Sequence, residues 1–341
     1  MSMSEQLTRN VASSAPSSAL EKQGATHRRQ DVARFLLRYS LPLVLLLFVV
    51  GLGLSNRTFF TFSNFRVILL EVSPIAFLAV GETMVILTGG IDLSVGAIVG
   101  LSGVVAALIA QNDGAWAATF AVVGGVAVGG LVGATTGFLV SVAKVPPFVA
   151  SLGAATTALG FGYVFSEGRP ISGLSDQFLA VSGGIGPVPI PIAAMVIVIA
   201  LAWLALTRTM FGMHVYAVGG NPQAARVAGV KIRKIRFLVY TISGLLGGLS
   251  GVTLCSRATA GIITTGSGYE LNAIAAAVIG GVSLMGGRGS VLGAVLGFMI
   301  LGVVGNGMNI LNISPFYQLI IKGVIIVGAV FTDSYLNQER E

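Results

Sequence analysis

Charged residues are what this sequence has least of. Asp, Glu, Lys and Arg together make up 10% of its 341 residues, whereas soluble domains carry about 25%. Hydrophobic residues make up 54%, and the mean hydropathy is +0.89. This fraction of charged residues is too small to cover the whole surface of a protein that is surrounded by water. The composition therefore excludes an ordinary soluble domain and favours a membrane protein.

Cysteine and histidine are almost absent. The single Cys255 excludes an internal disulfide and lies in an apolar run, so we expect it to be a small buried side chain. His27 and His214 are far apart, and neither has the neighbours of a zinc site or of a Cys–His nucleophile. A Ser–His pair, or two carboxylates on facing spans, does not stand out either. We therefore expect no catalytic residue and no metal in this chain.

Ten apolar runs approach the length of about 20 residues that a spanning helix needs. They are 36–54, 67–88, 93–111, 115–140, 147–166, 188–207, 236–255, 271–285, 290–311 and 315–332. The eighth is short, so a full span and a re-entrant segment both remain open for it, and eight or nine spans are also compatible. We predict an all-α polytopic membrane protein of about ten transmembrane helices. A single transmembrane domain covers 35–333, between a polar, disordered tail at 1–34 and a short tail at 334–341.

Lys and Arg outnumber Asp and Glu by 20 to 13. They form no stripe interleaved with aromatic residues, so we do not expect nucleic acid as a partner. With the N-terminus inside and ten spans, the cytoplasmic segments hold 15 Lys and Arg residues and the outside segments hold four. This bias follows the positive-inside rule, and it predicts that both termini are cytoplasmic.

The segment "GGIDLSVG" separates the second and third spans. Gly89 and Gly90 allow the sharp reversal of a tight cytoplasmic hairpin, which also contains Asp92 and Ser94. We expect the Asp92 carboxylate to cap the first turn of the third span. A role of Asp92 in gating or coupling is the open alternative.

A second segment, "GGVSLMGGRGS", echoes the first and predicts another cytoplasmic hairpin at Gly286, Gly287 and Arg288. Internal echoes of this kind are typical of transporters built from repeats.

The glycine spacing of this second segment is similar to that of a phosphate-binding loop. However, Gly287 and Arg288 occupy the positions of the Lys and the Ser or Thr that such a loop requires. We expect no ATP site in this chain.

The longest cytoplasmic loop, 210–237, contains "NPQAARVAGV". Asn221 and Pro222 predict the start of a short helix and Gly229 its end, because Pro favours the first helical position and Gly the position after the last. A short helix between long spans would dock a cytoplasmic partner. A loop held on the membrane surface by its Lys and Arg residues is the alternative.

Ionisable groups within spans are few, and two of them have similar depth and opposite sign. Glu71 lies about 7 Å and Lys322 about 10 Å inside the outer ends of their spans. Such groups usually face a bundle interior or a wet cavity. We predict that the two pair near the outer mouth, with snorkelling of Lys322 to the surface as the alternative. Glu82, deeper in the second span, has no obvious partner.

Amide side chains recur at the end of the ninth span. Asn306, Asn309 and Asn312 are three residues apart, which predicts a polar stripe on one helical face, and Gln318 follows in the tenth span. Amides that face a pathway would suit a hydroxyl-rich solute. Hydrogen bonds between helices are the alternative.

Glycine recurs every four residues along the fourth span, at Gly125, Gly129, Gly133 and Gly137. Such a seam of small residues lets another helix approach closely. The neighbouring helix belongs either to this chain or to a second copy.

Four long motifs resemble the membrane subunit of ribose-type ABC importers, in the superfamily of branched-chain amino acid and ribose permeases. They are "GETMVILTGGIDLSVGA", "YAVGGNPQAARVAGVKI", "GSGYELNAIAAAVIGGVSLMGGRGS" and "GVVGNGMNILNISPFYQLIIKGVII". The resemblance runs from about Phe35 to Asp333, in order. The family's ATPase-coupling loop falls on Asn221, Ala224, Ala225, Arg226, Gly229 and Val230.

The resemblance implies a transporter subunit of the bacterial cytoplasmic (inner) membrane, and not an enzyme. Two permease copies, as a homodimer or with a paralogue, would form the pathway through the lipid. Two ATP-binding domains would bind ATP and Mg and drive transport, so this chain would hold no cofactor. An extracytoplasmic binding protein would deliver ribose or a related sugar or sugar alcohol.

A self-sufficient secondary transporter is the alternative function. It would use an ion gradient and would need ionisable groups near the midplane. Glu71, Glu82 and Lys322 keep this alternative open.

Overall fold

A computed structural model of the chain describes residues 42–112, 114, 116–185 and 188–338. The predicted tail at 1–34 lies outside these residues. The first helix is Pro42–Ser55. It is followed by η1 (Arg57–Phe60), α3 (Phe62–Leu87), α4 (Val95–Ala110), α5 (Ala117–Ser141), α6 (Pro147–Ser166), α7 (Asp176–Leu179), η2 (Ala180–Ser182), β1 (Gly184–Ile185), β2 (Val188–Pro189), α8 (Ile190–Arg208), α9 (Met210–Gly220), α10 (Pro222–Val227), α11 (Ile232–Ala258), η3 (Ile263–Gly266), α12 (Tyr269–Ile279), α13 (Val291–Ile310) and α14 (Pro315–Gln338).

Six described helices are long and apolar enough to cross a membrane: α3, α5, α6, α8, α11 and α13. Helix Pro42–Ser55, α4 and the apolar part of α14 are shorter. The prediction of an all-α polytopic membrane protein is confirmed. Helix α12 has only 11 residues, a length of about 16 Å or roughly half the hydrocarbon core of a bilayer. Helix α14 continues to Gln338 and so includes the first part of the expected tail at 334–341.

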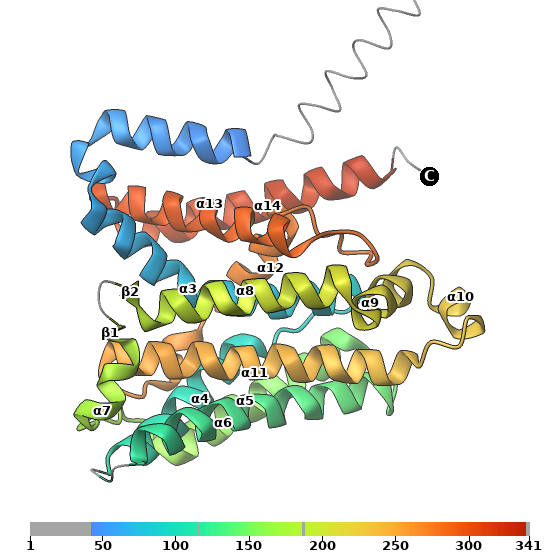
Figure 1. Cartoon of the computed structure of the whole chain (residues 1–341), viewed down its shortest axis with the longest axis horizontal. Helices are drawn as coiled ribbons and strands as arrows, with labels where there is room; N and C mark the ends of the chain where they lie inside the picture. Colours follow the sequence, from blue (N-terminus) through green and yellow to red (C-terminus); the bar gives the residue numbers. More distant parts are fainter. Residues whose placement is uncertain (1–41, 113, 115, 186–187, 339–341) are drawn as a thin grey trace, which may run out of the picture.

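The long helices lie side by side and define two ends of the molecule (Figure 1). Helix α10 protrudes at one end, which we call the α10 end. Helix α7 and the small antiparallel pair β1–β2 lie at the opposite end, which we call the hairpin end. The bundle therefore has one end built from a helical knob and another capped by a short hairpin.

The glycine seam of α5 packs against α11 of the same chain. A Cβ on Gly129 or Gly133 would overlap backbone atoms of Gly244 or Tyr240, and one on Gly137 would lie 2.9 Å from the carbonyl oxygen of Phe237. Two helix backbones therefore touch along this seam, which larger side chains would force apart. The neighbour that the sequence left open is within the chain.

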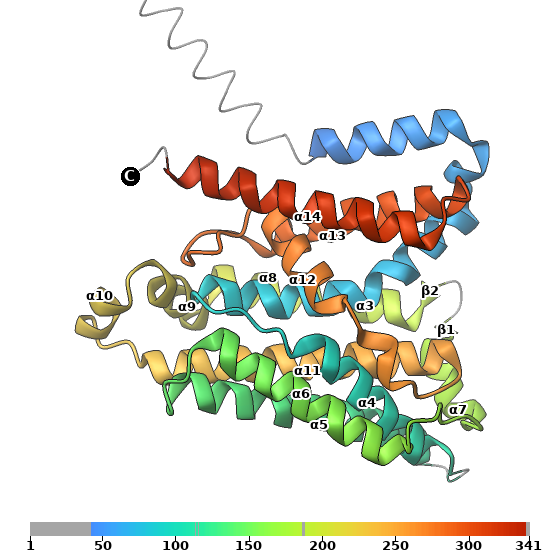
Figure 2. The same cartoon turned by 180° about the vertical axis from the view of Figure 1, so that it is seen from behind.

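The segment between α3 and α4 returns into the bundle, contrary to the prediction of a tight cytoplasmic hairpin. Gly89 takes a φ of +77° just beyond the end of α3, and the chain then runs back toward the middle of the molecule (Figure 2). Asp92 and Ser94 are fully buried. Ser243, twelfth of the 27 residues of α11, donates a hydrogen bond of 3.4 Å to Asp92 Oδ2. Helix α4 therefore begins at about half the depth of the bundle.

Buried non-helical backbone needs hydrogen-bond partners, because no water or lipid can supply them at this depth. The N–H of Asp92 donates to Glu82 Oε1 at 3.1 Å, and the Tyr240 hydroxyl donates to the carbonyl of Ile91 at 3.4 Å. Asp92 Oδ1 in turn accepts from the N–H of Ser94 at 2.9 Å and from its hydroxyl. Asp92 thus orders the residue directly before α4, and does not cap the first turn of α4 as predicted.

Helix α12 starts close to the start of α4. Gly96, the second residue of α4, packs against the carbonyl of Gly266 and the carboxylate of Glu270, so closely that a Cβ on Gly96 would overlap both. The N-terminal ends of these two short helices therefore meet inside the bundle. From there α4 runs toward the hairpin end and α12 toward the α10 end (Figure 2). Broken helices of this kind recur in transporters.

Candidate functional site

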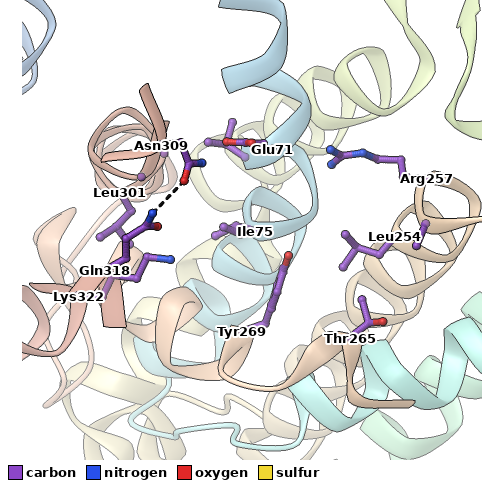
Figure 3. A pocket seen from close by; sticks show the side chains of 14 residues that line it. Glu71, Ile75, Leu254, Arg257, Thr265, Tyr269, Leu301, Asn309, Gln318 and Lys322 are labelled. Atoms are coloured by element: carbon purple, nitrogen blue, oxygen red, sulfur yellow. Dashed lines mark hydrogen bonds between the residues drawn. The ribbon is translucent and has the colours of Figure 1, made fainter. Parts of the chain in front are cut away.

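A polar cavity of about 430 Å³ lies between α3, α11, α12, α13 and α14 (Figure 3). Its polar lining residues are Glu71, Arg257, Thr265, Tyr269, Asn309, Gln318 and Lys322. Apolar side chains such as Val72, Ile75 and Leu301 complete the wall. The volume is within the range of small-molecule sites, and a few polar groups converging on an apolar wall are typical of them.

Four of the six predicted pathway residues line this cavity: Glu71, Asn309, Gln318 and Lys322. Gln318 Nε2 donates to Asn309 Oδ1 at 2.9 Å, and so links α14 to α13 (Figure 3). Glu71 and Lys322 face the same space, but no ion pair joins them in the described part of the chain. The predicted proximity of the two charges is present, whereas their direct pairing is not.

The other two members of the asparagine stripe have separate environments. Asn306 is buried and exchanges two hydrogen bonds with Asn64 of α3, of 3.0 and 2.9 Å. Asn312 has a φ of +54° and lies beyond the last turn of α13. The N–H of Ile313 there donates to the carbonyl of Met308, as in a Schellman ending. A spacing of three residues therefore does not keep these three amides in one pathway.

Arg257, which the sequence analysis treated only as an outside flanking charge, is part of the cavity wall. Its Nη1 donates at 2.7 Å to the carbonyl of Leu70 in α3. Pro74 has no N–H to offer that carbonyl, which lies four residues earlier and accepts instead from Arg257 and from the Ser73 hydroxyl at 3.0 Å. Pro74 inside an apolar helix was the sequence signal for a carbonyl that needs another donor. The donor, Arg257, lies 187 residues after Leu70 and could not be identified from that signal.

Tyr269 and Thr265 were also missed as cavity residues. They belong to the start of α12 and to η3, the elements that re-enter the bundle from the hairpin end. The cavity can therefore offer donors and acceptors from amides, hydroxyls and charges of both signs. Such a set suits an uncharged solute rich in hydroxyl groups. Among the described residues, no group of three or more His, Cys, Asp or Glu could hold a metal ion.

Helix α10 has the boundaries that the sequence predicts. Asn221 Oδ1 accepts from the N–H groups of Gln223 and Ala224 at 3.0 Å each. Gly229 takes a φ of +83° after the last turn. Val230 and Gly229 donate there to the carbonyls of Ala225 and Arg226, which is a Schellman motif. The helix is capped at both ends and presents Val227, which is 90% exposed, as an apolar tip.

Ala225 is the one buried residue of α10, and Ala224 and Arg226 are exposed. The six residues that the resemblance assigns to coupling are therefore the N-cap of this helix, three residues within it and two residues just after it. The geometry gives a rigid, protruding knob whose base is anchored by Ala225.

Three glycine-containing segments meet beneath α10. The N–H of Gly287 donates to the carbonyl of Leu87 at 3.0 Å. Gly219 of α9 packs on the same carbonyl and on Gly287, so closely that a Cβ would overlap both. Gly286 lies against Gly89. We call this contact between α9, the end of α3 and the loop after α12 the glycine junction. The two predicted glycine segments thus come together, at Gly89 and at Gly286 and Gly287, while Arg288 lies just beyond.

Comparisons with known proteins show similarity to permease components of transport systems. The family model described as the branched-chain amino acid transport system / permease component matches residues 64–330. The ribose import permease protein of Escherichia coli K12 is 39% identical over 317 residues, which cover 92% of this chain and 98% of that protein. The ribose import permease protein of Bacillus subtilis is 39% identical over 293 residues, 85% of this chain and 90% of its own. The D-allose transport system permease protein of Escherichia coli K12 is 35% identical over 312 residues, covering 90% and 95%. No solved structure matched the chain.

Proposed function

Because the chain belongs to the family of permease components of branched-chain amino acid transport systems, we propose that it is the membrane permease subunit of an ATP-driven ABC importer for a monosaccharide. The observation that carries the proposal is the 39% identity to ribose import permeases over more than nine-tenths of this chain. Ribose is the first solute to test, followed by related sugars and sugar alcohols. The protein is not an enzyme, and ATP hydrolysis belongs to separate subunits.

The α10 end faces the cytoplasm in this proposal. Lys144, Arg208 and the basic residues from Arg226 to Arg236 lie at or near this end, whereas Arg57 and Arg169 lie near the other. That bias follows the positive-inside rule of bacterial inner-membrane proteins. Ten transmembrane segments result when the first helix, the two short helices α4 and α12, and α14 are added to the six long helices. Both termini are then cytoplasmic.

Helix α10 is the part that docks an ATP-binding domain. It is short, capped at both ends and protrudes from the bundle (Figure 1). The residues assigned to this contact are Asn221, Ala224, Ala225, Arg226, Gly229 and Val230. Two ATP-binding domains and a second permease copy complete the transporter, and an extracytoplasmic binding protein delivers the sugar to the hairpin end.

The glycine junction supplies a route from this docking site to the solute pathway. Movement of α9 and α10 acts on the end of α3 and on the loop that leads into α13, without an intervening flexible side chain. Helices α3 and α13 carry Glu71 and Asn309 of the polar cavity. Docking of the ATP-binding domain at α10 would therefore change the positions of the polar residues that line the cavity.

Uptake by proteoliposomes tests this proposal. The permease is reconstituted with its ATP-binding domains, and labelled ribose is added outside with the binding protein. The expected result is uptake that requires ATP hydrolysis by the ATP-binding domains docked at α10. Uptake that instead follows an imposed ion gradient, without ATP, would make the protein a secondary transporter.

A further inference from the structure

A second cavity, of about 790 Å³, lies beside α10 and is strongly basic. Its wall comes from the end of α5, the loop that leads to α6, α10 with the segment that follows it, and the start of α11. It contains Lys144, Arg226, Lys231, Arg233, Lys234 and Arg236, and none of its lining residues is acidic. No ion pair neutralises these six cations within the described residues. So many like charges around one space call for an anion from outside the chain.

The backbone at Lys144 points to a requirement for its side chain. Lys144 has a φ of +60°, a conformation that glycine adopts easily and that other residues rarely adopt. Lys144 lies three residues after the end of α5, where the N–H of Val145 donates to the carbonyl of Leu139 at 3.0 Å. A lysine in a position suited to glycine brings a positive charge to the cavity at a conformational cost.

The remaining walls are apolar and adjoin exposed apolar side chains of α6. Val140, Val145, Pro147 and Ile232 line the cavity. Phe148 and Val149, the next residues of α6, are each 56% exposed. A small soluble anion would make no apolar contacts with these walls, whereas the glycerol and acyl chains of a phospholipid would cover them. Basic pockets between transmembrane helices are known to bind anionic headgroups.

We propose that this cavity binds the headgroup of an anionic glycerophospholipid of the inner leaflet, with its acyl chains along α6. The phosphate lies between Lys144 and the cations at the start of α11. Arg226 and Val230, which we assign to the contact with the ATP-binding domain, also line the cavity, so the lipid lies directly beside that contact. The bound lipid thus fixes the base of α10 to the membrane surface. This inference goes beyond the importer proposal and does not depend on which solute is carried.

Native mass spectrometry of the delipidated full-length protein tests the proposal. It is titrated with phosphatidylglycerol and with phosphatidylethanolamine of the same acyl chains. We expect phosphatidylglycerol to bind at least about tenfold more tightly, because each Lys or Arg near a headgroup contributes to attraction of an anionic lipid. Equal binding of the two lipids would overturn the proposal.

Paired variants separate the cavity from general surface charge. Lys144→Gln/Arg233→Gln removes two charges from the cavity. Arg208→Gln/Arg288→Gln removes two from the same end of the molecule but outside the cavity. The first pair should weaken phosphatidylglycerol binding by about tenfold and the second by less than about twofold.

Two further results would contradict the proposal. Displacement of the lipid by millimolar inorganic phosphate would show that the cavity takes a free anion. Unchanged lipid binding by Lys144→Gln/Arg233→Gln, together with loss of ATPase-subunit assembly, would assign the cavity to a protein partner. Melting temperatures of all variants, measured in detergent without added lipid, show whether each is folded.

Discussion

The N–H of Gly287 donates a hydrogen bond of 3.0 Å to the carbonyl oxygen of Leu87, and so joins the loop after α12 to the end of α3. Gly219 of α9 packs directly on the same carbonyl. One backbone oxygen is thus shared by three segments that are distant in the sequence. Any displacement of α9 is passed to α3 and to this loop, because no side chain at the contact can absorb it.

Substitution at this junction should uncouple the protein. Gly219→Ala places a methyl group onto the carbonyl of Leu87, and overpacking of this kind costs about 1–3 kcal/mol. We expect a strong loss of ATP-dependent uptake. The neighbouring Gly220→Ala is the control, because its Cβ would meet no atom within 4 Å. Normal uptake by Gly219→Ala, equal to that of Gly220→Ala, would exclude the junction from coupling.

The Asn64–Asn306 pair should stabilise the bundle. Each amide is buried and donates to the other. Asn306→Ala therefore leaves the buried Oδ1 of Asn64 without a partner, at a cost of about 1–3 kcal/mol, while Asn64 Nδ2 keeps its bond to the carbonyl of Phe59. The double variant Asn64→Ala/Asn306→Ala should cost less than the sum of the two single variants. Unfolding in detergent measures this coupling.

Asn309→Ala serves as the control for this pair, because it removes an exposed amide from the same helix. Its effect on the free energy of unfolding should be well below that of Asn306→Ala. Additive effects in the Asn64 and Asn306 cycle would show that the two amides do not act together.

Uptake should depend on the polar cavity. Lys322→Met and Asn309→Ala each remove a polar group from its wall, and a lost hydrogen bond of about 0.5–1.5 kcal/mol predicts a decrease in transport efficiency of roughly two- to tenfold. Tyr317→Phe is the control, because Tyr317 is 65% exposed and does not line the cavity. Full uptake by both cavity variants would remove the cavity from the solute pathway.

Asp92 should be required for the break between α3 and α4. Asp92→Ala removes the acceptor for Ser94 and Ser243 and should destabilise the protein by about 1–3 kcal/mol. Asp92→Asn keeps one oxygen acceptor and should retain most of the stability. Melting temperatures test this, and a coupled ATPase assay of Asp92→Asn tests the separate hypothesis of a role in coupling. Normal coupling would leave Asp92 with a structural role alone.

Local sequence signals predicted the helices well. Helix α6 has the predicted bounds of 147–166, because Pro147 starts an apolar run and fixes its first turn. Helix α10 is bounded by Asn221 and Gly229, whose preferences act within a few residues and need no tertiary partner. Such signals are readable from one sequence.

Depth and side-chain partners could not be predicted in the same way. The apolar pattern of 93–111 is the same whether its helix starts at the surface or inside the bundle, and the contact that places Asp92 comes from Ser243, 151 residues later. Asn306 was assigned to a pathway because its partner, Asn64, is 242 residues away. The position of Arg257 in the cavity wall could be predicted only by knowing that it donates to the carbonyl of Leu70, which receives no N–H from Pro74. These features depend on tertiary packing.

ATP hydrolysis by the reconstituted transporter tests the central claim most directly. It is measured with and without the sugar-loaded binding protein, for the unchanged chain and for Arg226→Ala/Gly229→Val, with assembly of the ATP-binding domains checked for both. The importer account predicts that the loaded binding protein stimulates hydrolysis, and that the α10 variant assembles but loses this stimulation. If no ATP-binding domain assembles with the chain, and solute uptake follows an imposed ion gradient, the account is contradicted.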